Sequence, residues 1–226
     1  MLCGFLRSVG FVPFLITSFL CPSAAVPADV NRAPLIFNSD QIVSVEKSGT
    51  RVVGDRFHEQ IKPLADLISK GEGDYNAINR GRAGDTPGGI QGLTGMTFEN
   101  YTVGQVKDMQ RRRLFAVGRY QFIPTTLRFA VAHSDVDDLD MFTPDVQDRL
   151  FATLVLYKRP SVGAFLRGNH DLIEWAINDL AREWASVEYR HGRGFHDHIG
   201  GNRAHITRAE ARVALLESRN AVVNNK

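Results

Sequence analysis

The chain has almost no cysteine and no long hydrophobic segment. Its two cysteines, Cys3 and Cys21, lie near the start of its 226 residues, in a stretch that reads as a removable leader. A disulfide framework therefore cannot hold the remaining chain together, and its hydrophobic core must suffice. The apolar run 9–20 is broken by Pro13. It is shorter than the roughly 20 residues that a membrane-spanning helix needs.

An excess of charge of either sign is also missing. The chain has 27 Lys and Arg against 25 Asp and Glu, a formal net charge of +2. Removal of Arg7 with the leader would leave 26 against 25, a net charge of +1. Such a balance does not favour nucleic acid or an anionic membrane surface as a partner. We expect no nucleic-acid partner, and a membrane contact only through the leader.

The first 25 residues have the pattern of a secretory signal peptide. Arg7 is their only charge, an apolar run follows, and Ser23–Ala25 supplies small residues for cleavage after Ala25. This pattern predicts a periplasmic or secreted protein. The alternatives are an uncleaved anchor and a lipoprotein acylated at Cys21, which the two bulky residues before that cysteine disfavour.

The rest of the chain divides into three parts. Residues 26–56 carry few periodic patterns and are expected to form an arm or linker. Residues 57–190 are expected to form the main domain, and 191–226 a loop and a C-terminal helix packed on it. A glycine- and threonine-rich stretch from Tyr75 to about Val103 predicts a small hairpin or irregular lobe without long helices. Periodicity and capping residues predict helices over 58–70, 102–113, 124–132, 143–157, 161–167, 171–187 and 207–219.

Glu72 stands in the most informative local setting. Leu64, Leu67 and Ile68 follow helical spacing, and Gly71 is a natural residue to end the helix. Glu72 would then lie where a rigid helix meets an open loop, with room for a bulky polymer to reach it. The alternative is an ordinary surface glutamate near a helix end, although functional residues favour loops on rigid scaffolds.

Four short motifs occur in order over about residues 57–187. Together they resemble the lambda-type phage endolysin family of the lysozyme-like superfamily, some of whose relatives are exported muramidases. The motifs are Ser69 with Glu72-Gly73 and Asn76, Gly118-Arg119-Tyr120-Gln121, Thr143-Pro144 with Gln147-Asp148, and Trp184-Ala185-Ser186.

The resemblance implies a mainly α (α+β) fold. It would be a single lysozyme-like domain with a small glycine-rich lobe, a larger helical lobe and a cleft between them. It also implies a peptidoglycan-cleaving enzyme that acts on glycan strands, with no cofactor and no metal. For an exported enzyme with an extra arm, a localised role beside envelope or secretion machinery is a further possible partnership. The competing class is a non-catalytic protein that binds glycan or takes part in envelope assembly.

The implied chemistry is cleavage of the β-1,4 bond between N-acetylmuramic acid and N-acetylglucosamine, with Glu72 as general acid. Apolar shielding would raise the pKa of its carboxyl and keep it protonated. Neighbouring phage lysozymes carry an Asp nine residues later, where this chain has Gly81. Asp85 could be the second catalytic group, although it also suits a turn. Otherwise Glu72 would serve as acid and base of a lytic transglycosylase that forms a 1,6-anhydro sugar.

The same resemblance places substrate-binding residues at Tyr75, Asn76, Arg119, Tyr120 and Gln121. The last three are expected to line the cleft opposite Glu72, where a tyrosine can stack on a sugar and a glutamine can bind its N-acetyl group. The alternative is that Tyr120 belongs to the core and Arg119 to a salt bridge.

Several other polar or aromatic residues have simpler interpretations. Trp175 and Trp184 are expected in the core, since a tryptophan on the apolar face of a helix usually is. The late histidines have no common zinc-ligand spacing and are expected in a solvated loop near the cleft. The run 111–113 of three arginines is expected on a solvated helix face, with anionic peptide stems or wall polymers as its alternative ligands.

Overall fold

The computed structural model describes residues 56–198 and 203–224 of the chain. The predicted signal peptide and all but the last residue of the predicted arm lie outside these residues. The described chain is mostly helical with a few short strands, in agreement with a mainly α fold. None of its helices is both long and apolar enough to cross a membrane.

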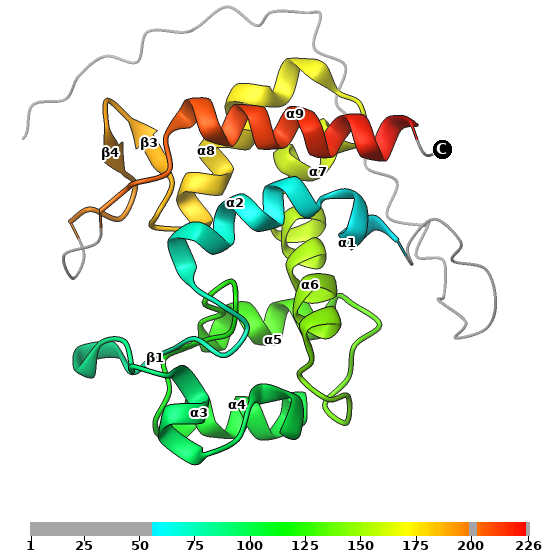
Figure 1. Cartoon of the computed structure of the whole chain (residues 1–226). Helices are drawn as coiled ribbons and strands as arrows, with labels where there is room; N and C mark the ends of the chain where they lie inside the picture. Colours follow the sequence, from blue (N-terminus) through cyan, green and yellow to red (C-terminus); the bar gives the residue numbers. More distant parts are fainter. Residues whose placement is uncertain (1–55, 199–202, 225–226) are drawn as a thin grey trace, which may run out of the picture. The chain divides into compact units, whose positions relative to one another are not determined.

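Figure 1 shows the order and arrangement of the elements. The α-helices and strands are α1 (Phe57–Gln60), α2 (Lys62–Glu72), β1 (Ile78–Asn79), α3 (Gly89–Thr94), α4 (Val103–Arg112), β2 (Ala116–Val117), α5 (Pro124–Ala132), α6 (Pro144–Thr153), α7 (Pro160–Leu166), α8 (Ile173–Glu183), β3 (Glu188–Arg190), β4 (Arg193–Gly194) and α9 (Arg208–Asn224). Short 3₁₀ turns span Gly81–Ala83, Phe98–Asn100 and His170–Leu172, and a π-helical turn at Leu154–Lys158 continues α6.

The helix predicted over 58–70 is two helices. The chain leaves helical geometry at Ile61, which has φ −92° and ψ 15°, between α1 and α2. Pro63 does lie in a first turn, but in that of α2. It has no N–H with which to continue the hydrogen-bond ladder of α1, and this accounts for the new start.

The residue that ends α2 is Gly73, so the prediction that Gly71 ends it was wrong. Gly73 has φ +144°, a conformation that suits glycine, whereas Gly71 remains within the helix. Gly71 serves close packing instead. A Cβ at this position would lie 2.4 Å from the Cβ of Ser186, so only glycine lets the Ser186 backbone approach the helix.

The helix predicted over 171–187 ends four residues early. Helix α8 stops at Glu183, and Trp184 is already extended at φ −116° and ψ 122°. Trp184 is buried as predicted, and its indole N–H donates to the Tyr120 carbonyl over 3.2 Å. The prediction of a core position for Trp175 was wrong, because its side chain is 60% exposed on α8. Residues 184–187 are thus a loop segment, hereafter the Ser186 segment.

The stretch after α2 forms an irregular lobe of short elements. Strands β1 and β2 pair antiparallel, with Ile78 opposite Val117, and Asn79 forms a further bridge to Asp85. Helix α4 closes this part of the chain and begins with a capping box, in which Thr102 and Gln105 satisfy each other's backbone amides. A second small sheet pairs β3 with β4.

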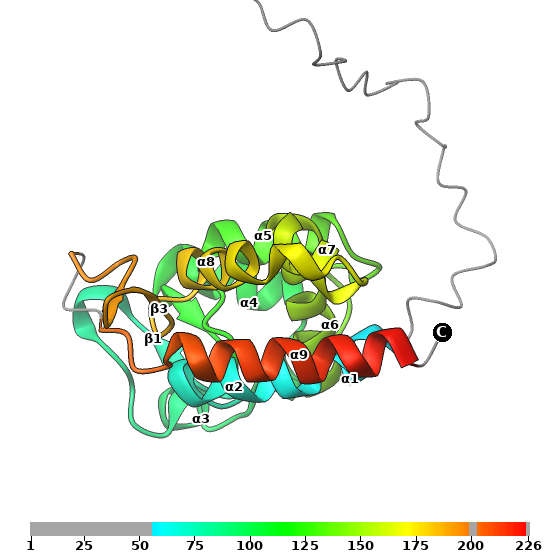
Figure 2. The same cartoon turned by 90° about the horizontal axis from the view of Figure 1, so that it is seen from above.

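Helix α9 packs along α2 and also contacts α7, α8 and α1 (Figure 2). Ala211, Leu215 and Val222 add its buried face to the core. The Ser218 hydroxyl of α9 accepts a 3.0 Å hydrogen bond from the Leu64 amide in the first turn of α2. One of the amides that a helix start leaves unpaired is therefore satisfied from a distant element.

Candidate functional site

The candidate site is built around Glu72, the last residue of α2. The Ser186 hydroxyl donates a 2.6 Å hydrogen bond to Glu72 Oε1, and the Ser186 backbone also hydrogen-bonds this carboxyl. Ser186 itself is 4% exposed. The two residues are 114 positions apart in the chain, so the fold brings them together.

Backbone hydrogen bonds fix the position of Ser186. The amides of His205 and Ile206 both donate to the Ser186 carbonyl over 2.9 Å, and Val187 forms a parallel bridge with Ile206. Gly71 allows the close contact on the other side: a Cβ there would lie 3.0 Å from His205 Nε2 as well. Glu72 is therefore held at the end of α2 by the Ser186 segment, which residues 205–206 keep in position.

The surroundings of Glu72 favour its protonated form. Burial has the largest effect and raises the pKa of its carboxyl. The hydrogen bonds from Ser186 and the charge of His205 act in the opposite direction, while the negative charge of Asp85 raises the pKa further. The net shift is upward, so Glu72 keeps its proton to a higher pH than an exposed glutamate. This is the property that a general acid needs.

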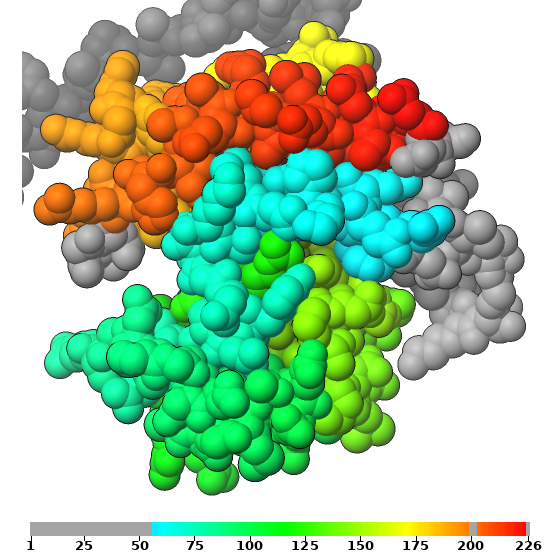
Figure 3. Space-filling view, viewed as in Figure 1, coloured from blue at the N-terminus to red at the C-terminus, as the bar shows by residue number. Residues whose placement is uncertain are grey.

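The surface is hollowed near the C-terminal end of α2. Figure 3 shows a hollow there, between the orange surface of residues near 190–198 and 203–207 and the teal surface of residues near 79–90. Asp85 belongs to the second of these segments. Its Oδ1 accepts a 2.7 Å hydrogen bond from the Asn79 side chain. The structure thus brings both predicted catalytic residues, Glu72 and Asp85, within electrostatic reach of each other.

A polar network also reaches α2 through Asp66 and Ser69, and Arg119 is its centre. Arg119 pairs with Asp66 and donates to Tyr75 Oη over 2.8 Å. Asp148 accepts hydrogen bonds from Tyr75 at 3.0 Å and from Tyr120 at 2.5 Å. The Arg119 network, as we call it, consists of Asp66, Ser69, Tyr75, Arg119, Tyr120 and Asp148.

This network corrects the predicted role of Tyr120. The ring is 1% exposed and stacks on Phe151 at 4.2 Å, so it offers no face to a sugar. Burial and the neighbouring Asp148 raise the pKa of its hydroxyl, which keeps it a proton donor. Of the two predicted roles for Arg119, the geometry agrees with the salt bridge. The side-chain hydrogen bonds of Tyr75 and Arg119 described above are made to other protein groups.

The other two predicted substrate-binding residues organise the loops beside the site. Asn76 accepts a 2.9 Å hydrogen bond from the Phe98 amide through its side-chain oxygen. Gln121 is half-buried and has φ +46°, an uncommon conformation for a residue other than glycine. Its side-chain amide donates to the Gly118 carbonyl over 3.0 Å. A contact of either residue with a glycan stays a prediction.

Gln147 joins three segments and has no exposed surface. Its side chain accepts from the Arg119 amide at 3.0 Å and donates to the Tyr75 carbonyl at 3.1 Å and the Phe142 carbonyl at 3.3 Å. Together with the Trp184 bond to Tyr120 and the Ser186 bond to Glu72, these contacts connect all four sequence motifs. The motifs were recognisable in the sequence, but their mutual contacts were not.

The late histidines form no metal site in the described part of the chain. No group of three or more His, Cys, Asp or Glu side chains there could hold a metal ion. Their positions differ: His205 lies beside Glu72, whereas His196 Nε2 lies 3.0 Å from the Arg182 carbonyl. The influence of His205 on Glu72 was missed from the sequence, which offered only its membership of a histidine-rich loop.

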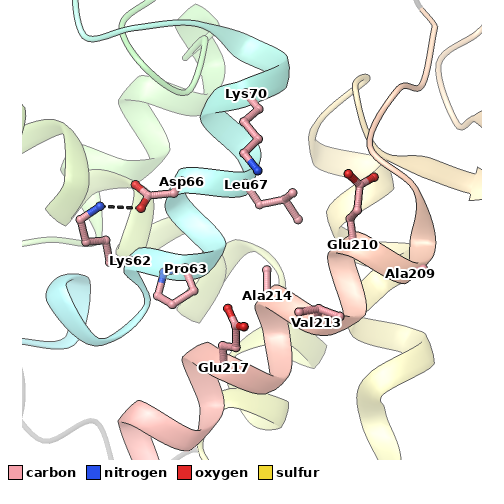
Figure 4. Close-up of a pocket in the computed structure, with 10 residues that line it drawn as sticks. All are labelled: Lys62, Pro63, Asp66, Leu67, Lys70, Ala209, Glu210, Val213, Ala214 and Glu217. Atoms are coloured by element: carbon pink, nitrogen blue, oxygen red, sulfur yellow. Dashed lines mark hydrogen bonds and ion pairs between the residues drawn. The ribbon is translucent and has the colours of Figure 1, made fainter.

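A separate groove of about 630 Å³ runs between α2 and α9 (Figure 4). Neither Glu72 nor Ser186 lines it, so it is distinct from the site described above. The lining residues are Lys62, Pro63, Asp66, Leu67, Lys70, Ala209, Glu210, Val213, Ala214 and Glu217.

The chain has no match among protein-family models, curated proteins or solved structures. A functional assignment must therefore depend on the geometry and electrostatics of the Glu72 site.

Proposed function

We propose that this protein cleaves the β-1,4 bond between N-acetylmuramic acid and N-acetylglucosamine in peptidoglycan, with Glu72 as the general acid. The observation that carries the proposal is the Glu72 carboxyl itself. It is shielded at the end of a rigid helix, is held by Ser186 and has a raised pKa, and the surface is hollowed near that end of the helix. The resemblance of the four motifs to lambda-type endolysins supports the same chemistry and the lysozyme-like fold.

In the first step Glu72 transfers its proton to the glycosidic oxygen. The bond between C1 and this oxygen breaks, and its electron pair leaves with the N-acetylglucosamine oxygen. Positive charge develops at C1 of the muramic acid. The ionised Glu72 that results is stabilised by the hydrogen bonds from Ser186 and by the charge of His205.

Two second steps are compatible with the residues present. Asp85 could take a proton from a water molecule that attacks C1, which completes hydrolysis. Alternatively, Glu72 could take the proton of the sugar's own 6-hydroxyl, whose oxygen then closes a 1,6-anhydro ring. Asp85 is exposed to water and its charge acts on Glu72, so hydrolysis is one of the two candidate reactions. This chain has Gly81 where the related lysozymes have their second acid, so transglycosylation is the other.

The predicted signal peptide places this activity in the periplasm or outside the cell. Unrestrained cleavage of the wall would be lethal to a bacterium, so we propose a localised role in wall remodelling, beside envelope or secretion machinery.

Glu72→Gln tests the assignment, because the amide keeps the shape and a hydrogen-bond acceptor but has no acidic proton to transfer. Purified sacculi should be cleared by the wild-type protein and should remain intact with the variant. Glu99→Gln, at an exposed position of the small lobe, is the matched control. Equal clearance by wild type and Glu72→Gln would exclude Glu72 as the acid. Pelleting with sacculi but no clearance by either protein would instead indicate a glycan-binding module.

Mass spectrometry of the released muropeptides distinguishes the two second steps. Reducing N-acetylmuramic acid ends indicate hydrolysis, and Asp85→Asn should then abolish their release. Products with 1,6-anhydro ends indicate transglycosylation, and Asp85→Asn should then leave the end chemistry unchanged.

A further inference from the structure

The hairpin β3–β4 and the residues after it carry exposed cations on an aromatic support. We call residues 188–196 the basic hairpin. Arg190 and Arg193 are exposed, and within the described residues neither forms an ion pair. Two aromatic rings belong to the same hairpin: Tyr189 and Phe195 meet edge to face with centroids 5.2 Å apart.

Among the described residues, Arg190 is positioned by an aromatic ring and by no side-chain hydrogen bond or ion pair. Its guanidinium carbon lies 4.9 Å from the centre of the Tyr189 ring, while Arg182 lies 5.8 Å from both rings. A guanidinium stacked on a ring keeps its N–H groups directed outward in its own plane. This cation–π contact therefore restrains Arg190, and no other described residue occupies its side-chain donors.

The nearby acids do not neutralise these two arginines. Glu188 accepts from the Gly192 amide at 2.7 Å and from the Arg208 amide at 3.2 Å, and these backbone bonds lower its pKa. Asp197 has a buried Oδ1, and Asp179 pairs with Arg182 at 3.2 Å. Glu188 therefore stays ionised, but residues 188–196 carry two arginines against this one carboxylate, and their net charge is positive.

The basic hairpin continues directly from the Glu72 site. Strand β3 begins two residues after Ser186, and the Glu188 amide donates to the Ile206 carbonyl over 2.8 Å. Figures 1 and 2 both show β3 near the end of α2 that carries Glu72. The hairpin and the Ser186 segment that holds Glu72 are therefore consecutive parts of the chain.

We propose that the basic hairpin binds carboxylates of the peptide stems carried by the glycan strand. This inference rests on the proposed function, since peptidoglycan bears such a stem on each muramic acid, next to the bond to be cleaved. The flat fork of an arginine matches a carboxylate with two parallel hydrogen bonds. The hairpin would thus select glycan that still carries its peptides.

The test uses Glu72→Gln protein, so that binding is measured without turnover. Co-sedimentation with intact sacculi at low salt gives the affinity. Adding Arg190→Gln and Arg193→Gln should weaken binding by at least about tenfold, because two charge-assisted hydrogen bonds are lost. Arg128→Gln with Arg167→Gln removes two exposed arginines, one from α5 and one at the end of α7, and should leave the affinity unchanged. Thermal melting of each variant checks that the hairpin substitutions do not unfold the protein.

Sacculi whose carboxylates have been converted to amides with carbodiimide and ethanolamine identify the ligand group. Binding of the Glu72→Gln protein to them should fall to the level of the hairpin variant. Unchanged binding to amidated sacculi would overturn the proposal, since phosphates and sugar hydroxyls survive that treatment. Equal loss in the control pair, Arg128→Gln with Arg167→Gln, would also overturn it. Both outcomes are read from binding alone, so they are independent of whether Glu72 proves to be the catalytic acid.

Discussion

At the scale of single residues, Glu72 lowers the stability of the fold at neutral pH. Burial raises the pKa of its carboxyl above that of the unfolded chain. Below the unfolded pKa, near 4.3, the group is protonated in both states and costs nothing. As the pH rises, the unfolded chain releases its proton more easily than the folded one, and stability is lost.

We therefore predict that Glu72→Gln stabilises the protein at pH 7 while it abolishes activity. The melting temperature should rise by about 2–4 °C for each kcal/mol gained. The difference from wild type should vanish below about pH 4, where Glu72 is neutral in either state. Differential scanning calorimetry at pH 3.5, 5 and 7 measures it, with Glu99→Gln as control. A gain that is the same at all three pH values would contradict a titration effect.

Ser186 affects the same carboxyl in the opposite direction. Its hydroxyl donates to Glu72 Oε1 at 2.6 Å, which favours the ionised form and lowers the pKa. Ser186→Ala should thus raise the pKa of Glu72, and the fall of activity with rising pH should shift to higher pH. The pH–rate profile on sacculi shows the shift. A lower rate at every pH with an unmoved profile would mean that Ser186 has only a structural role.

The sequence allowed Glu72 to be identified but not its partners. The glutamate is flanked by glycines after an apolar periodic segment, and these are local features. Ser186 and His205 are far from it in the chain, and their contacts depend on how α2 packs against the loop after α8. Tyr120 was assigned to the cleft because its burial also depends on such long-range packing.

At the scale of elements, capping residues were the most dependable predictors. Thr143 and Thr207 precede α6 and α9 as expected, and each accepts a hydrogen bond from an amide of the first turn. Helix ends determined by tertiary packing were predicted less well. Gly71 has the residue type of a helix end, yet it stays helical because the Ser186 segment needs the space above it.

Gly71→Ala separates these two roles. In an exposed helix the change would stabilise by about 1 kcal/mol. Here the added methyl group would lie 2.4 Å from the Ser186 Cβ, and that segment would have to move. We predict a lower melting temperature and a large loss of activity on sacculi, whereas Lys70→Ala on the same helix should change neither. A stabilised and active Gly71→Ala protein would show that the Ser186 segment is free to shift.

At the scale of the whole molecule, the Arg119 network connects segments that are distant in sequence. It joins α2 through Asp66, the loop after α2 through Tyr75, and α6 through Asp148. The Ser186 segment is attached to the same region by the bond from Trp184 to the Tyr120 carbonyl. The placement of Glu72 relative to the loops around it therefore depends on residues that do not touch a substrate.

Arg119→Met tests whether this residue supports the fold or contacts the glycan, as the sequence motif had suggested. Its side chain is 13% exposed, and its loss leaves Asp66 and Asp148 without their shared cation. Breaking a buried pair costs about 3–5 kcal/mol, but both acids retain some contact with water. We therefore predict a loss of about 2–3 kcal/mol in the free energy of unfolding, measured by urea denaturation.

The same variant should keep its half-saturating concentration of sacculi, when assayed at a temperature where it remains folded. Arg128→Met, which removes an exposed arginine from α5, should change neither quantity. A raised half-saturating concentration with unaltered stability would instead return Arg119 to the substrate-binding surface. Such a result would also mean that the network in the free protein opens when glycan binds, because every polar contact of Arg119 described above is made to another protein group.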